Sequence, residues 1–267
     1  MTALASTRRL DNGGAMTAVI EEISDSFWNI RGSFKVLGVL DVGTQMSLAQ
    51  LGSGGFVLLD SYTLSGKALR QVLTKTVGGR RIEATLNLHP FHTVHTRAVA
   101  EAFPEAKLYG TRRHVERAPD LRWEEIHTED PELADVFGED FVFSVPRGVD
   151  FIPENQNLHF ASVLAFHKAS QTLHVDDTLG FSGLPLIGGL QLHPSLGSVL
   201  QKRRGAVAEF RAWLNELVEL CRKTEHLCTA HMKTRPGPEI ERDLVKLVVK
   251  ASALVEKKLA RHETRYG

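Results

Sequence analysis

The alternation of strand-like and helix-like segments over the first 110 residues constrains the fold more than any other feature of the chain. Short apolar runs bounded by glycine predict strands, and apolar residues three and four positions apart predict helices. The segments read in this way are FWNIRGSFKVLGVL (27–40), SLAQLGSGGFVLLDS (47–61), TLSGKALRQVLTKTVGG (63–79), RIEATLNL (81–88), TRAVAEAF (96–103) and AKLYG (106–110). The order of strand, helix, strand, helix and strand predicts a protein that mixes helices with sheets.

The second half of the chain has a similar content of strands and helices. Residues 157–166 and 170–179 are strand-length runs that predict a hairpin joined by residues 167–169. Two helices are predicted at 206–221 and 239–262, and a short strand that ends at His231 lies between them. Two such halves predict two sheets packed on each other with helices outside.

Three further features of this half bear on packing and on the site. The first of the two helices has an apolar stripe that we expect in the core, formed by Phe210, Trp213, Leu214, Leu217 and Val218. Residues 111–139 are polar and carry no clear pattern. Residues 180–197 are rich in glycine, proline and leucine, and we expect a loop there that borders a functional site.

Charge and cysteine content narrow the class of partner. Lys plus Arg and Asp plus Glu both number 32, so the net charge is zero and no basic field is available for nucleic acid or an anionic membrane. We therefore expect a small-molecule substrate as partner, with no nucleic acid and no membrane. The N-terminus has no apolar signal segment, and the two cysteines, Cys221 and Cys228, form no disulfide framework. A cytoplasmic protein is expected, with a flexible lead over residues 1–16 and a single domain over 17–267.

Three histidines follow the strand-like run 81–88 at every third position: His89, His92 and His95. Pro90 allows only a first helical turn there, and one turn cannot close three imidazoles around one ion. The run by itself therefore does not identify a metal site.

Other imidazole and carboxylate groups also stand at the ends of predicted strands. They are His159 near the start of the hairpin, Asp176 and Asp177 at its end, and His231 at the end of the last strand. A transition metal needs nitrogen and oxygen ligands that converge from several directions at about 2 Å. Groups from these separate segments would meet that need if the fold brings the strand ends together.

The order of these residues resembles the metallo-β-lactamase fold superfamily. Its signature is H-x-H-x-D-H after a strand, then a histidine before a hairpin, an aspartate that closes the hairpin, and a final histidine. GGFVLLDS resembles the early strand with its terminal aspartate, and NLHPFH stands at the place of the signature. HFASVLAFHKASQTLHVDDTLGF resembles the second histidine, the hairpin and the G-D-T-L-F stretch, and LCTAHMKTRPG resembles the last strand. The resemblance covers residues 27–237 and implies an αββα sandwich of two mixed sheets flanked by helices, an α+β fold.

Carried over position by position, the resemblance implies five metal ligands: His89, His92, His159, Asp177 and His231. Two positions of the signature differ, since Asn87 replaces its first histidine and Phe91 replaces its aspartate. One or two ions are implied, with zinc favoured and iron or manganese as alternatives. His92, Asp177 and His231 would make a one-ion set that leaves a coordination position open for water.

The resemblance implies a metal-dependent hydrolase, in which metal-bound hydroxide attacks an ester, amide, thioester or phosphoester of a small molecule. Asp177 is the residue that could also transfer the proton, because the signature aspartate is missing. The alternative is a non-catalytic binding or structural protein that keeps the fold and has lost the metal, an interpretation that Phe91 supports.

Several neighbouring residues are expected outside the ligand set. Asp60 is interpreted as a residue that caps its strand or supports a ligand, and His95 as one that lies beside the ligands or at the surface. Asp176 is expected on the face opposite to Asp177 and in solvent, if the strand continues through both. His167 and His174 are expected at the surface of the hairpin.

Overall fold

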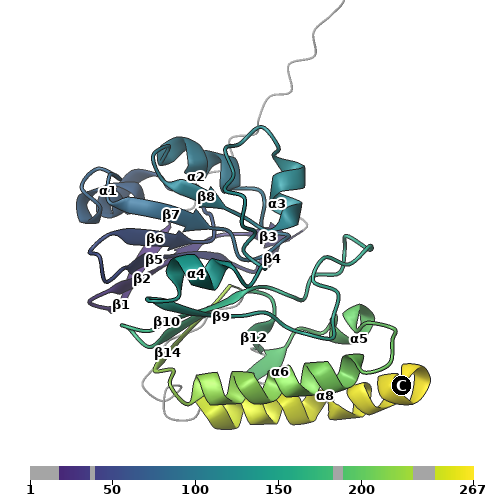
Figure 1. Cartoon of the computed structure of the whole chain (residues 1–267). Coiled ribbons are helices and arrows are strands. Elements are labelled where there is room, and N and C mark those ends of the chain that lie inside the picture. The colour runs from purple at the N-terminus through teal and green to yellow at the C-terminus, as the bar shows by residue number, and fades with distance from the viewer. Residues whose placement is uncertain (1–17, 37–39, 183–188, 231–243) are drawn as a thin grey trace, which may run out of the picture.

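Two β-sheets face each other, and helices cover the outer side of each sheet (Figure 1). The structure is a computed structural model that describes residues 18–36, 40–182, 189–230 and 244–267. Over these residues the first sheet has the strand order β1-β2-β5-β6-β7-β8 and the second has the order β14-β11-β10-β9. The predicted αββα sandwich is therefore confirmed.

The first sheet is built from the N-terminal part of the chain. Its strands are β1 (Val19–Ser24), β2 (Phe27–Gly32), β5 (Thr44–Gln50), β6 (Phe56–Leu59), β7 (Ile82–Leu86) and β8 (Lys107–Tyr109). The pairs from β1 to β6 are antiparallel, and β6, β7 and β8 are parallel. Parallel neighbours need a crossover, which is why α1 (Gly66–Lys75) and α2 (Thr96–Ala102) lie between them in the chain.

The second sheet consists of β9 (Phe141–Ser144), β10 (Leu164–His167), β11 (Thr172–Val175) and β14 (His226–Thr229). The pairs β9–β10 and β10–β11 are antiparallel, and β11–β14 is parallel. Its outer face is covered by α6 (Ala206–Cys221) and α8 (Leu244–Tyr266), which run side by side (Figure 1). The remaining elements are β3 (Lys35–Val36), β4 (Leu40–Asp41), β12 (Leu179–Ser182), β13 (Gly189–Leu192), α3 (Arg112–Arg117), α4 (Leu133–Phe137) and α5 (Leu196–Val199).

Side-chain alternation divides the apolar core into three layers. In β6, Val57 and Leu59 face the second sheet, while Phe56 and Leu58 face α1 and α2. In β10, Ala165 faces the first sheet and Leu164 and Phe166 face α6 and α8. Each sheet is thus covered on one face by the other sheet and on the other face by helices.

The hairpin is confirmed, although its strands are shorter than predicted. β10 begins at Leu164 rather than at residue 157, and the turn comprises residues 168–171 rather than 167–169. His167 is therefore the last residue of β10, where it pairs with Thr172 of β11.

The predicted helices at 63–79, 96–103 and 206–221 correspond to α1, α2 and α6, with ends that differ by a few residues. The helix predicted at 239–262 corresponds to α8 where it is described, from Leu244 onward. The polar stretch 111–139 contains α3 and α4, and the expected loop at 180–197 contains parts of β12, β13 and α5. Among the helices of the described residues, none combines the length and the apolar character that a membrane crossing requires.

Candidate metal centre

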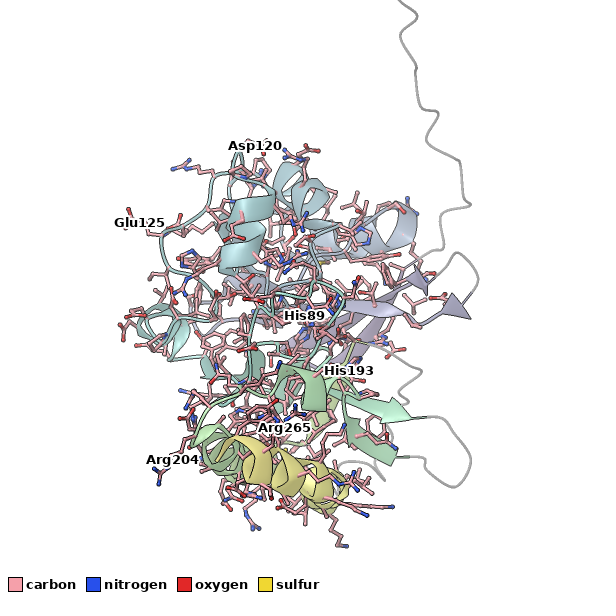
Figure 2. The ribbon with its side chains drawn as sticks, turned by 90° about the vertical axis from the view of Figure 1, so that its right-hand side faces the viewer. His89, Asp120, Glu125, His193, Arg204 and Arg265 are labelled. Carbon is pink, nitrogen blue, oxygen red and sulfur yellow. The ribbon has the colours of Figure 1, made fainter. Side chains whose placement is uncertain are left out.

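Two loops at one edge of the sandwich carry the candidate ligands. β7 ends at Leu86 and leads into the loop with His89 and His92, and β11 ends at Val175 and leads directly into Asp176 and Asp177. His89 lies near the middle of the molecule, between the two layers (Figure 2). The site is thus assembled from both halves of the chain.

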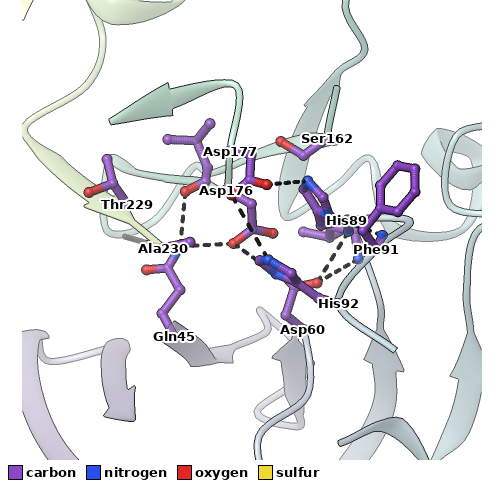
Figure 3. Close-up of polar contacts among 12 residues, drawn as sticks. Gln45, Asp60, His89, Phe91, His92, Ser162, Asp176, Asp177, Thr229 and Ala230 are labelled. Atoms are coloured by element: carbon purple, nitrogen blue, oxygen red, sulfur yellow. Dashed lines mark hydrogen bonds and ion pairs between the residues drawn. The ribbon is translucent and has the colours of Figure 1, made fainter. Parts of the chain in front are cut away.

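His89, His92 and Asp177 form a group that has the spacing of metal ligands. His89 Nε2 lies 3.1 Å from Asp177 Oδ2, and His92 Nε2 lies 3.9 Å from Asp177 Oδ1 (Figure 3). One ligand atom from each of the three residues lies within 4.8 Å of the other two. Two ligands at about 2.1 Å from a tetrahedral ion are roughly 3.4 Å apart, so the observed separations fit a shared ion.

His89 is fully buried and its two ring nitrogens have different surroundings. Nδ1 accepts a hydrogen bond from the backbone N–H of Phe91 at 3.1 Å. Nε2 is close enough to Asp177 for an ion pair but lacks the alignment of a hydrogen bond. A buried polar atom in this condition is a candidate ligand atom. Because Nδ1 accepts this hydrogen bond, the proton of the neutral ring is on Nε2. An ion that binds at Nε2 would displace this proton, and if the proton moved to Nδ1 the hydrogen bond from Phe91 would be lost.

His92 stands between two carboxylates. Its Nδ1 lies 3.8 Å from Asp176 Oδ1, while its Nε2 faces Asp177. The ring stacks on that of His89, with centroids 4.2 Å apart, and its side chain is 19% exposed. His92 N–H donates to the carbonyl of His89, so the run makes one tight turn and places both imidazoles on the same side.

His159 approaches the group from the loop before the hairpin. Its Nδ1 lies 3.8 Å from Asp177 Oδ2, and 41% of its side chain is exposed. Burial of the remainder lowers the pKa of His159, which favours the neutral ring that a metal needs. His159 therefore lies at the open side of the site.

Phe91 occupies the place of the signature aspartate as part of a stack of three planar groups. Its ring lies parallel to that of His159, with centroids 4.3 Å apart, and the Arg113 guanidinium lies 4.5 Å from the ring centre. Arg113 also donates to Pro90 and Gln156, which holds it against the loop. Position 91 thus contributes an apolar wall and no ligand atom.

His231 lies outside the described residues. The last described residues before it are held by the first sheet, because Arg31 donates hydrogen bonds to the carbonyls of Thr229 and Ala230. Its role as a ligand stays a prediction.

Asn87, at the place of the first signature histidine, is committed to the fold. Its side-chain N–H donates to the Tyr109 carbonyl at 2.9 Å, and its Oδ1 accepts from Ser61 at 2.7 Å and from Thr96 at 3.4 Å. The amide of Asn87 therefore offers no free ligand atom. His95 lies apart from the group, against Tyr62 and within 2.8 Å of the Thr63 hydroxyl.

Three residues that we expected at the surface are buried. His167, His174 and Asp176 are each at most 1% exposed. The expectation for the histidines was wrong because the hairpin is covered on both faces. The expectation for Asp176 was wrong because β11 ends at Val175, so strand alternation does not extend to the two aspartates.

A second buried group, formed by Asp60, His174 and Asp176, lies next to the first, since Asp176 Oδ1 is 3.8 Å from His92 Nδ1. His174 Nε2 is 2.8 Å from Asp60 Oδ2, and its Nδ1 is 3.0 Å from the Ser47 hydroxyl. Asp60 Oδ1 accepts from the backbone N–H groups of Leu88 and His89, so this residue supports the ligand loop. Burial opposes the charge of Asp60, yet the hydrogen bond and charge of His174 outweigh it and lower the pKa of Asp60.

Burial and the neighbouring charge of Asp60 raise the pKa of Asp176 well above its ordinary value. The sequence indicated a supporting role for Asp60 through its place at the end of a strand. It contained no comparable signal for Asp176, His174 or Arg113, since their roles depend on contacts between residues far apart in the chain.

Comparison with known proteins identifies the fold. The metallo-β-lactamase FIM-1 from Pseudomonas aeruginosa in its mono-zinc form superposes with a TM-score of 0.57 at 12% identity, covering 91% of this chain and 99% of that one. A metallo-β-lactamase from Erythrobacter litoralis with β-mercaptoethanol in its active site gives 0.57 at 11% identity, covering 87% and 96%. DIM-1 metallo-β-lactamase exposed to ceftazidime gives 0.55 at 11% identity, covering 89% and 99%.

No family model and no curated protein matches the sequence, so the likeness is one of structure. The similarity extends over nearly the whole length of these enzymes, and the candidate ligands lie at the loops that the signature indicated. The protein is thus a divergent chain with the metallo-β-lactamase fold.

Proposed function

We propose that the protein is a metal-dependent hydrolase that cleaves an ester, amide, thioester or phosphoester of a small molecule. The observation that carries the proposal is the convergence of His89, His92 and Asp177 from two distant loops, with donor separations that suit one ion. Zinc is the favoured ion because the set combines imidazole nitrogens with carboxylate oxygen, and iron or manganese are alternatives.

When bound, zinc supplies a Lewis acid and lowers the pKa of a coordinated water toward about 7. His89 and His92 would hold the ion together with Asp177, and His231 is proposed as a further ligand. Asp177 lies between His89 and His159, where its second oxygen can accept the proton that the reaction releases. The half-exposed face of His159 and the ring of Phe91 would contact the substrate, since they line the open side.

Phe91 and Asn87 favour one ion over two. Neither residue provides a free ligand atom, because Phe91 is apolar and the amide of Asn87 is satisfied by Tyr109 and Ser61. We therefore propose one tightly held ion under ordinary conditions.

A second candidate function is a binding protein that keeps the fold and holds a ligand at the same site without catalysis. Phe91 favours it, because the lost aspartate would otherwise orient the attacking water, and an aromatic ring stacked on His159 suits ligand contact. The two candidates differ in whether a metal is retained.

Metal analysis of protein purified without chelator and without a histidine tag separates the two. A hydrolase should carry close to one equivalent of transition metal and should turn over at least one member of a panel of chromogenic esters, thioesters, phosphodiesters and β-lactam amides. Less than about a tenth of an equivalent, not restored by added zinc, iron or manganese, supports the binding protein instead, since structured sites bind these ions tightly.

Substitution of single histidines then tests the ligand set. His92→Ala and His231→Ala should each lower the metal content, while His95→Ala is the matched control from the same run and should not. Equal metal content in all three variants would show that the ligands are misassigned.

A further inference from the structure

The chain lacks one acidic residue at the site and has another that the resemblance does not explain. Phe91 replaces the aspartate of the H-x-H-x-D-H signature, whereas Asp176 stands where the G-D-T-L-F stretch has its glycine. Both positions lie beside His92: Phe91 precedes it in the chain, and Asp176 approaches it across the site. An acidic side chain is therefore missing on one side of His92 and present on the other.

Asp176 is a buried carboxylate with few partners. It is 1% exposed, its Oδ1 accepts one long hydrogen bond of 3.4 Å from Gln45 Nε2, and its Oδ2 has no hydrogen-bond partner among the described residues. The one ion-pair partner that the described residues give it is the ring of His92. The nearby Asp60 is paired with His174 and offers Asp176 no positive charge, and a side-chain hydrogen bond between the two carboxyl groups helps to raise the pKa of Asp176.

The two nitrogens of His92 point to different carboxylates. Nε2 faces Asp177 and the metal group, while Nδ1 faces Asp176 at 3.8 Å. An imidazole that binds a metal through one nitrogen carries its proton on the other, and a carboxylate that accepts this proton fixes the ring and makes it a stronger ligand.

We propose that Asp176 is the positioning residue for His92: a carboxyl oxygen of Asp176 accepts the Nδ1–H of His92 and directs Nε2 to the metal. This inference rests on the proposed function, since it assumes that His92 binds a metal. Compared with the signature, this chain has no carboxyl group at the ligand position 91 but has one at position 176, on the side of His92 away from the metal group.

The alternative role for Asp176, as a member of a separate metal site with Asp60 and His174, fits the geometry less well. Asp60 Oδ2 and His174 Nε2 are 2.8 Å apart, the length of a direct hydrogen bond, so a proton already occupies the space that an ion would need. The distance of 3.8 Å between His92 Nδ1 and Asp176 Oδ1 is longer than a hydrogen bond, and the proposal requires it to shorten when an ion binds.

Zinc affinity of purified full-length variants, measured by competition with a chromophoric chelator, tests the proposal. Asp176→Gly removes the acceptor and should raise the zinc Kd by about 10-fold to 100-fold, the loss typical of a carboxylate behind a metal-bound histidine. Asp176→Asn keeps one acceptor oxygen and should raise the Kd by a smaller factor. Asp130→Asn is the matched control, because Asp130 also pairs with a histidine but does not belong to the candidate site. Its Oδ2 lies 3.0 Å from His127 Nδ1, and the zinc Kd of this variant should equal that of the parent chain.

A spectroscopic measurement separates positioning from a general effect on the fold. In the zinc-loaded parent chain, imidazole ¹⁵N spectra should show the His92 proton on Nδ1 and slow exchange of that proton with solvent. In Asp176→Gly the exchange should become fast while near-UV circular dichroism stays unchanged. Should Asp176→Gly fail to fold, the same comparison is made with Asp176→Asn.

Three results overturn the proposal. A zinc Kd of Asp176→Gly within about threefold of the parent value, or a His92 proton on Nε2 in the loaded parent chain, removes the positioning role alone. A parent chain that binds no zinc removes the proposed function together with this inference.

Discussion

At the residue scale, the surroundings of the buried His114 disfavour the charged form of its ring. His114 of α3 is buried against Trp123, and its Nδ1 lies 2.9 Å from the Thr111 hydroxyl. Burial disfavours the charged ring and lowers the pKa of His114 to about 4. The unfolded chain keeps an ordinary value of about 6.5, so the two states differ in proton uptake between these values.

This difference predicts a loss of stability in acid. Between pH 6.5 and 4 the unfolded state binds more protons at this residue, so the stabilisation is present above pH 6.5 and is lost as the pH falls toward 4. Urea unfolding at pH 7.5 and pH 5 should show a drop in the free energy of unfolding that is about 2 kcal/mol larger in the parent chain than in His114→Gln. Parallel pH profiles for the two proteins would contradict the assignment.

At the element scale, segments with a clear apolar pattern were predictable from sequence, whereas an exposed edge strand and two short helices were not. The stripe of α6 packs as predicted, with Phe210, Trp213 and Leu217 fully buried against the second sheet. β1 escaped prediction because it is an edge strand whose Val19 is 57% exposed, so it lacks an apolar run. α3 and α4 have six and five residues, too few for a period of 3.6 to be recognised.

The two faces of α6 should differ in their tolerance to substitution. Leu217→Ala removes a fully buried side chain and should lower the free energy of unfolding by about 3 kcal/mol, the usual cost of such a cavity. Glu216→Ala, one residue away on the exposed face, breaks the ion pair with Arg147 and should cost about 0.5 kcal/mol or less. Urea unfolding of both variants at pH 7.5 measures the difference, and similar losses would mean that the helix does not pack as described.

At the scale of the whole molecule, the candidate site belongs to both layers of the sandwich. Asp60, His89 and His92 follow strands of the first sheet, while His159 and Asp177 flank the hairpin of the second. The resemblance predicted His89, His92, His159 and Asp177 as ligands, and the sequence indicated a supporting role for Asp60, because the signature survives in outline. The buried group beneath it could not be predicted, since His174 lies in a strand that is buried on both faces and has no polar side to mark.

A metal bound across the two layers should stabilise the folded state as a whole. At a free zinc concentration of 1,000 times the Kd, linkage predicts about 4 kcal/mol of added stability and a rise in Tm of several degrees. The rise should vanish in Asp177→Asn and persist in His95→Ala, as measured by thermal unfolding with and without a chelator. If zinc does not change the Tm of the parent chain, no ion bridges the two layers.

Two independent constraints, the backbone conformation and the side-chain contacts, restrict which residue can stand at position 60. Its backbone is left-handed, with φ of 61°, a conformation that Asp, Asn and Gly adopt more readily than other residues. Its Oδ1 also accepts from the backbone N–H groups of Leu88 and His89, and its Oδ2 pairs with His174. Glycine offers no acceptor, and asparagine has a donating amide nitrogen in place of one of the two oxygens. The signature of this chain has lost its first histidine and its aspartate. Asp60, which directly follows β6, is therefore a better marker than the signature for recognising similarly altered sequences.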